Sequence, residues 1–355
     1  MKHIKSTASA LITLCASMFC LEVNAQRLTL SSELGYFTSD ENIPAISRVW
    51  AEYIRVIDLT DDTSQFWIEG SRDIHITLHK DGLLNTYNIR KLTDDVYEIN
   101  TIAYYPASVI KGGLVNAIYK VCAAQTESGW RLMNYFDVVK NQYKQYSIGS
   151  IDFCIGNGVF VDRKRMQASA RFAERFINRY NLDKNNRITY VSSASIDESS
   201  AMIGLVYTPI RSYKQYAGRT INNIVLSTRL DHIHEVVHAI MLPLYPNAPL
   251  FLHEGIASYY GGLSGLDYKD VKSRAKVAID NENVDLNDKD TMAILLENDI
   301  SLSNVIAAAI IEHTLQQGGE SAVLQLFKAI NYDQIFELLG VPKDQRELFI
   351  RSLFK

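Results

Sequence analysis

The sequence His234-Glu235-Val236-Val237-His238 stands within an apolar run that we expect to be helical. Two histidines four residues apart project from the same face of a helix, so their imidazoles can share one metal ion. Glu235 lies next to the first of them, where its carboxylate can reach a water molecule on that metal. We expect Ser227 or Thr228 to cap this helix and Pro243 to end it.

A second apolar segment, Phe251-Leu252-His253-Glu254-Gly255-Ile256-Ala257-Ser258-Tyr259-Tyr260, follows the turn between Pro243 and Pro249. A helical hairpin would bring the second helix antiparallel to the first and offer Glu254 as a third ligand. Two histidines and one carboxylate, with the fourth position open to water, are typical of a catalytic zinc site. A structural zinc site would usually include cysteine, and the sequence has none near these residues.

This pair of segments resembles the signature of the gluzincin metallopeptidases, in which HExxH is followed by Glu-Gly-x-Ala-x-Tyr. The second segment is similar to WLxEGxAxY of aminopeptidase-N-like enzymes. The shorter gap between His238 and Glu254 is more similar to bacterial peptidase-MA-like families, also called thermolysin-like. The resemblance covers residues 146–355, and it implies a thermolysin-like zincin domain with a small sheet and a mostly helical C-terminal half.

The resemblance also implies roles for individual residues. His234, His238 and Glu254 would bind Zn²⁺, and Glu235 would be the general base for a zinc-activated water that hydrolyses a peptide bond. The expected partner is a peptide or protein substrate. Because the chain has no Gly-x-Met-Glu-Asn segment to hold a free substrate amine, endopeptidase action is favoured.

One departure concerns the residue that stabilises the oxyanion. Related enzymes often use a tyrosine on a later helix, but residues 301–307 contain no tyrosine. Tyr259, Tyr260 and Tyr268 are candidates for this role, and each is equally well explained as a core or surface aromatic residue. Ser258, four residues after Glu254, could orient a ligand, or it is an ordinary small helix residue. We expect the remaining nearby histidines, His232 and His253, to lie on the surface.

Two other functions remain open from the sequence. The missing late tyrosine and the extra N-terminal region allow a catalytically weak or inactive peptidase-like binding protein, although Glu235 argues against it. A zinc hydrolase acting on a non-peptide bond would have the same ligands, because the ligand set fixes the chemistry of the metal but not the substrate.

Residues 1–25 have the pattern of a cleaved signal peptide: Lys2 and Lys5, an apolar run from Ala8 to Leu21, and Val23-Asn24-Ala25. We therefore expect export to the periplasm or the exterior. Cleavage would leave Cys122 and Cys154, which could form one disulfide or remain as two buried thiols. No later run is long and apolar enough to span a membrane.

Residues 26–142 form an expected α+β accessory domain. The spacing of apolar residues predicts a helix over 42–58, and strand-like runs follow from about 66 to 137, the first of them at 73–79. A helix followed by a meander of long strands is weakly similar to the cone-shaped domains of the nuclear-transport-factor-two-like superfamily. We expect the boundary in the polar stretch at 140–147. The whole chain is therefore predicted to be α+β.

Composition excludes several other classes. The 355 residues are 47% apolar and 21% charged, which is typical of a globular protein. The 36 Lys and Arg residues against 40 Asp and Glu residues give a net charge of −4, so there is no basic excess to bind nucleic acid.

Overall fold

The computed structural model describes residues 40–57, 59–60, 62–71, 74–75, 83–105, 114–183, 187–207, 218–281, 286, 295–296 and 300–355, and the backbone of Leu28–Leu30. The expected signal peptide lies outside these residues, and so do most residues of the strand predicted at 73–79. The described residues form two compact units. The first contains the chain up to Gln142 together with Ser200–Tyr207, and the second contains Tyr143–Ser199 and the chain from Gly218 onward.

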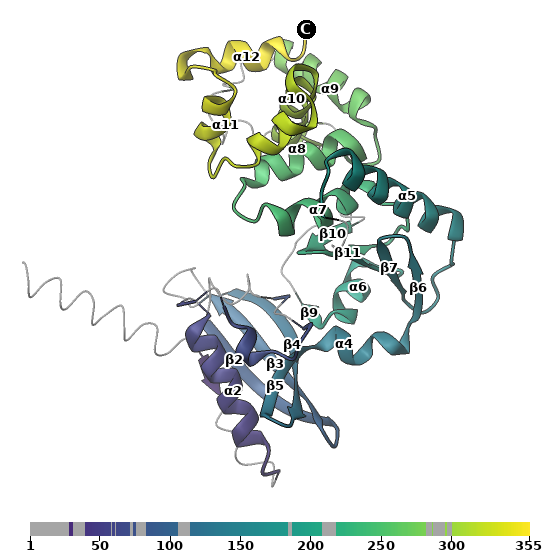
Figure 1. Ribbon diagram of the computed structural model, residues 1–355, viewed down its shortest axis with the longest axis vertical. Coiled ribbons are helices and arrows are strands. Elements are labelled where there is room, and N and C mark those ends of the chain that lie inside the picture. Colours follow the sequence, from purple (N-terminus) through teal and green to yellow (C-terminus); the bar gives the residue numbers. More distant parts are fainter. Residues whose placement is uncertain are drawn as a thin grey trace, which may run out of the picture. The chain divides into compact units, whose positions relative to one another are not determined.

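The first unit packs one helix, α2 (Ile43–Val56), against a sheet. Trp50 and Tyr53 of α2 are fully buried, and the Trp50 indole donates a 2.9 Å hydrogen bond to Oγ1 of Thr86. The predicted helix over 42–58 is therefore confirmed. The sheet order is β1-β2-β3-β4-β5, with the bounds β1 Leu28–Leu30, β2 Leu83–Thr93, β3 Val96–Tyr105, β4 Leu114–Thr126 and β5 Gly129–Asn134 (Figure 1).

The chain returns to this sheet after it has entered the second unit. Strand β9 (Leu205–Tyr207) pairs antiparallel with β4 through Ile118 and Tyr119, beyond the part of β4 that pairs with β5. Lys120 N also donates to Gly204 O at 2.8 Å. This return could not be predicted from the sequence, because three residues carry too short a pattern to reveal their pairing partner. The helices α4 (Tyr135–Val139) and η3 (Lys140–Gln142) lead from β5 to the second unit.

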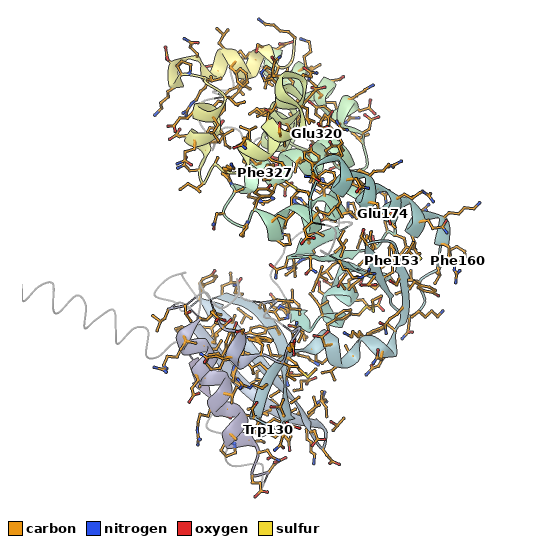
Figure 2. All side chains as sticks on the ribbon, in the orientation of Figure 1. Trp130, Phe153, Phe160, Glu174, Glu320 and Phe327 are labelled. Atoms are coloured by element: carbon orange, nitrogen blue, oxygen red, sulfur yellow. The ribbon has the colours of Figure 1, made fainter. Side chains whose placement is uncertain are left out.

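The second unit contains a five-stranded sheet in the order β10-β11-β8-β7-β6. The two outer pairs are antiparallel, and β7, β8 and β11 run parallel to one another. Phe153 of β7 lies in the core, whereas Phe160 in the following loop is exposed (Figure 2). The bounds are β6 Lys144–Ile148, β7 Ile151–Ile155, β8 Ile188–Ser192, β10 Gly218–Ile221 and β11 Ile224–Ser227.

Helices make up most of the rest of this unit. Helix α5 (Arg163–Arg179) is capped by Asp162, and its apolar face enters one core with the sheet and the later helices. The other helices are α6 Ile196–Met202, α7 Ile233–Leu244, α8 Leu250–Gly261, α9 Tyr268–Asn281, α10 Leu302–Leu326, α11 Tyr332–Leu338 and α12 Arg346–Ser352. The predicted α+β class is confirmed.

Two further expectations concern thiols and membranes. Cys122 and Cys154 are both buried and free, so the sequence interpretation of two buried thiols, and not that of one disulfide, agrees with the structure. Among the described residues, no helix combines the length and the apolar character needed to cross a bilayer.

Candidate metal centre

Helix α7 carries the HExxH sequence, and Glu235 to Met241 of this helix are buried. The helix begins at Ile233, later than predicted, and no side chain caps it. The expected cap at Ser227 or Thr228 is wrong, because Ser227 Oγ instead accepts from Arg229 N at 3.0 Å and lies 3.2 Å from Nδ1 of His232. Pro243 falls in the last turn of α7 and does not end it.

Two glycines at the end of α8 set its distance from α7. A Cβ atom on Gly261 would lie 2.3 Å from the backbone N of His234, so only glycine allows this approach. Gly262 ends the helix with φ of 70°, a conformation that glycine adopts without strain. Its carbonyl oxygen lies 3.0 Å from Nδ1 of His234. The end of α8 therefore fixes the first histidine of the motif directly.

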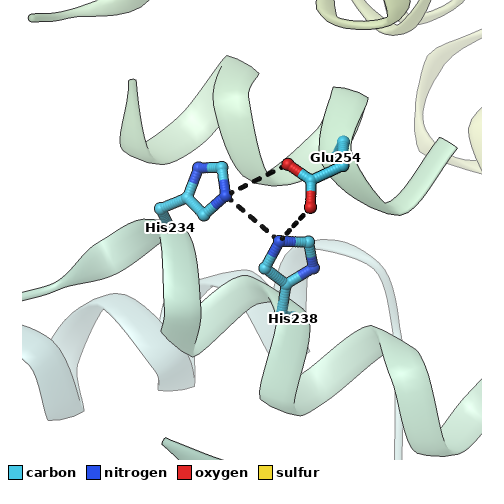
Figure 3. Close-up of side chains that lie close together, drawn as sticks. All are labelled: His234, His238 and Glu254. Carbon is cyan, nitrogen blue, oxygen red and sulfur yellow. Dashed lines mark hydrogen bonds and ion pairs between the residues drawn. The ribbon is translucent and has the colours of Figure 1, made fainter. Parts of the chain in front are cut away.

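Three potential ligand side chains converge between the two helices (Figure 3). Nε2 of His234 lies 3.1 Å from Nε2 of His238. The Glu254 carboxylate completes the triangle, with Oε2 at 3.5 Å from His234 Nε2 and Oε1 at 3.4 Å from His238 Nε2. The three residues that the sequence predicted as ligands thus lie together.

The three side chains are close enough to share one metal ion. Ligand atoms about 2.0–2.2 Å from a tetrahedral zinc lie about 3.3–3.6 Å from one another. Each histidine is 3.4–3.5 Å from a different oxygen of Glu254, and the two nitrogens are closer together, at 3.1 Å. The hydrogen bond from Nδ1–H of His234 to Gly262 leaves the lone pair of Nε2 facing its neighbours. A cation would satisfy the lone pairs that meet there. Two imidazoles and a carboxylate suit zinc, and they also suit other divalent transition metals.

Glu254 and His234 each favour the charged form of the other. Burial opposes ionisation of Glu254, but the contacts with His234 and His238 outweigh it and hold the pKa of this carboxyl well below its usual range. Burial likewise disfavours the charged form of His234, yet Glu254 raises the pKa of this imidazole. The carboxylate is therefore ionised at neutral pH and ready to bind a cation.

A residue that the sequence analysis overlooked supports Glu254. Asn304, in the first turn of α10, donates a 2.8 Å hydrogen bond from Nδ2 to Oε2 of Glu254. Helix α10 can approach because Gly255 faces Ala307, where a Cβ atom would lie 2.7 Å from the backbone carbon. The only signal in the sequence is an amide side chain between Leu302 and Val305, which are both buried.

The predicted general base is buried on the same helix as the two histidines. Glu235 follows His234 directly, and only 8% of it is exposed. Its Oε2 accepts a 2.8 Å hydrogen bond from Oγ1 of Thr220, on β10. Thr220 could not be predicted from the sequence, because the four-residue strand β10 gives almost no periodic signal.

The remaining candidates make contacts elsewhere. Ser258 is fully buried, and its Oγ has no hydrogen-bonding partner in the described part of the chain. Tyr260 lies 3.1 Å from the Tyr180 hydroxyl, and Tyr259 packs against Tyr260 and Tyr268. None of these recorded contacts involves a predicted metal ligand.

The expectation that His253 lies on the surface is wrong. It is 1% exposed, and its Nε2 lies 3.0 Å from the carbonyl oxygen of Tyr245 at the end of α7. Burial lowers the pKa of His253 to about 4, so the ring is neutral at pH 7 and Nε2–H can donate to this carbonyl. His253 therefore ties α8 to α7 within the hairpin. His232 is partly exposed.

No protein-family model matches this chain, and no curated protein matches its sequence. The assignment of the centre therefore depends on the chemistry and geometry of the side chains described above.

Proposed function

We propose that the protein is a zinc-dependent metallopeptidase, acting as an endopeptidase on peptide or protein substrates. One observation carries this proposal: two imidazole nitrogens and a carboxylate lie within 3.1–3.5 Å of one another, with a second carboxylate, Glu235, next to the first ligand in the chain. A protein that only stored a metal would have no need of Glu235. The signal-like residues 1–25 support the further proposal that the enzyme is exported.

The proposed mechanism assigns a separate task to each side chain. His234, His238 and Glu254 would hold the metal. A zinc ion there would supply Lewis acidity, which lowers the pKa of a water molecule toward about 7 and polarises a carbonyl oxygen. Glu235 takes the proton of the attacking water and returns it to the nitrogen of the leaving amine.

Asn304 and Gly262 act on the ligands and not on the substrate. Asn304 holds one oxygen of Glu254, and the Gly262 carbonyl holds His234 in the tautomer that leaves Nε2 free. Such contacts reduce the number of orientations that the ligands can adopt, which favours metal binding.

The experiment is a measurement of metal content and peptide hydrolysis on the purified protein and three variants. We expect about one zinc per chain, less zinc in Glu254→Ala, and full zinc with only a small residual rate of hydrolysis in Glu235→Gln. Glu337→Gln, at an exposed site on α11, is the matched control and should behave as the unaltered protein. A library of internally quenched peptides with blocked termini tests endopeptidase action.

The other outcomes identify the alternatives. Zinc without cleavage of any peptide would contradict peptidase activity and favour a binding protein or a zinc hydrolase of a non-peptide bond. A protein that takes up no zinc from buffered zinc solutions would contradict the whole proposal.

A further inference from the structure

Strand β10 lies at the edge of the five-stranded sheet and packs beside α7. Gly218 permits this approach, since a Cβ atom there would lie 2.3 Å from Nδ1 of His232 and 2.8 Å from Cγ of Glu235. Thr220 lies two residues further along the strand and therefore on the same face. Its Oγ1 is 2.8 Å from Oε2 of Glu235 and 3.0 Å from the main-chain oxygen of the same residue.

The Thr220 hydroxyl has one proton and two acceptors within reach. An ionised carboxylate is the stronger acceptor, so the hydroxyl donates to Oε2 when Glu235 is charged. Within the described residues, Oε1 of Glu235 has no recorded hydrogen-bonding partner. One oxygen is thus anchored to the sheet, and the other is left for the proton that is transferred.

We propose that Thr220 is a positioning residue for Glu235, and this inference rests on the proposed peptidase function. A glutamate side chain has three rotatable bonds, and a general base is effective only within hydrogen-bonding reach of the proton that it removes. The hydroxyl restricts the carboxylate to one orientation beside the ligands. Thr220 itself takes no part in proton transfer.

The first test compares Thr220→Val, which replaces the hydroxyl by a methyl group of similar size, with Thr220→Ser, which keeps the hydroxyl. We expect kcat of Thr220→Val to fall roughly 10- to 100-fold, as for loss of a hydrogen bond to a charged group. KM and zinc content should be unchanged, and Thr220→Ser should retain most of kcat. Thr189→Val, on β8 of the same sheet, is the matched control and should not change kcat.

A second measurement asks whether Thr220 acts through Glu235. In a Glu235→Gln background, Thr220→Val should lower the residual rate by less than twofold, because the base on which it acts is already lost. An unchanged kcat in Thr220→Val, an equal loss in Thr220→Ser, or the same fold-loss in the Glu235→Gln background would each overturn the inference.

The third measurement does not depend on activity. Crystal structures of the unaltered protein and of Thr220→Ala report the conformation of Glu235 directly. Alanine is smaller than valine, so this variant should be usable even if Thr220→Val does not fold. We expect one Glu235 conformer in the unaltered protein and several in Thr220→Ala. A single, unmoved conformer in Thr220→Ala would contradict positioning. Ordered Glu235 in a protein without peptidase activity would instead show that the proposed function had failed while the contact was real.

Discussion

Asn304 of α10 donates a 2.8 Å hydrogen bond to Glu254 of α8, across 50 positions of sequence. Because an ionised carboxylate can only accept, the contact identifies Nδ2 as the atom that faces Glu254. It holds in place the one proposed ligand that does not belong to the HExxH helix. Helices α7, α8 and α10 therefore all contribute to the position of the ligand atoms.

Replacing Asn304 by Leu should lower the affinity for zinc about 10- to 100-fold, the usual effect of removing a side chain that orients a ligand. The variant should still fold, because Asn304 is only partly buried. Competition with a chromogenic chelator measures the affinity. Ser303→Ala, on the same helical turn, is the control and should bind zinc as the unaltered protein does. Equal affinities for Asn304→Leu and the unaltered protein would show that the contact does not support the ligand.

Replacing Gly255 by Ala should destabilise the protein by about 1–3 kcal/mol, the usual cost of overpacking a core. Within a helix, replacing Gly by Ala ordinarily stabilises a protein by up to about 1 kcal/mol. A loss of stability would therefore indicate the close contact between α8 and α10. The added Cβ atom would lie 2.8 Å from Cβ and 2.7 Å from the backbone carbon of Ala307. Urea unfolding of the metal-free protein measures the change.

A second variant identifies the cause of that loss. Ala307→Gly in the Gly255→Ala background removes the contact between the two Cβ atoms but not the contact with the backbone. It should therefore restore only part of the stability. Full recovery would locate the whole conflict in the Ala307 methyl group, and a stabilising Gly255→Ala would contradict the close approach of α8 and α10.

The cluster of His234, His238 and Glu254 could be predicted because it follows from local spacing. His234 and His238 share a helical face, and Glu254 follows after one short turn, so only a helical hairpin had to be assumed. Asn304 and Thr220 could not be predicted in the same way. Their contacts depend on how α10 and β10 pack, and those positions are set by the glycines at 255 and 218 rather than by any periodic pattern.

Errors in the sequence analysis have similar physical reasons. His253 was expected at the surface because histidine is polar, but the hairpin turns its ring toward the carbonyl of Tyr245. Ser227 was expected to cap a helix, but its hydroxyl oxygen accepts a hydrogen bond from Arg229 N and lies beside Nδ1 of His232. The return of Leu205–Tyr207 to the first sheet is a long-range pairing that a three-residue strand cannot signal.

Cys122 should be unreactive in the folded protein, since burial raises the pKa of its thiol to about 12. The reactive thiolate is therefore almost absent at pH 8. We expect no adduct at Cys122 or Cys154 when the native protein is treated with iodoacetamide, and two adducts after unfolding in urea without reductant. Mass spectrometry counts the adducts. Two adducts only after reduction would show a disulfide and contradict the free thiols.

The same shift makes stability depend on alkaline pH. The folded pKa of Cys122 lies above the unfolded value of about 8.5, so its contribution is fully present below pH 8.5. As the pH rises from there toward 12, the thiol ionises in the unfolded chain but not in the folded one, and stability is lost. Cys122→Ala should show a smaller decrease in the free energy of unfolding between pH 8 and 10 than the unaltered protein.

Ser258 lies one helical turn after Glu254, and its replacement tests whether its hydroxyl orients a proposed ligand. The side chain is fully buried on α8, yet its hydroxyl has no hydrogen-bonding partner among the described residues. A buried hydroxyl without a partner is costly, and replacing it by a methyl hydrogen removes that cost. We therefore expect Ser258→Ala to bind zinc with unchanged affinity and to be as stable as the unaltered protein, or up to about 1 kcal/mol more stable. Chelator competition and urea unfolding, run beside Asn304→Leu, measure both quantities.

A loss of zinc affinity in Ser258→Ala comparable with that of Asn304→Leu would show that the hydroxyl orients Glu254 or His238. A loss of stability with normal zinc affinity would show that it has a structural partner, such as a buried water molecule.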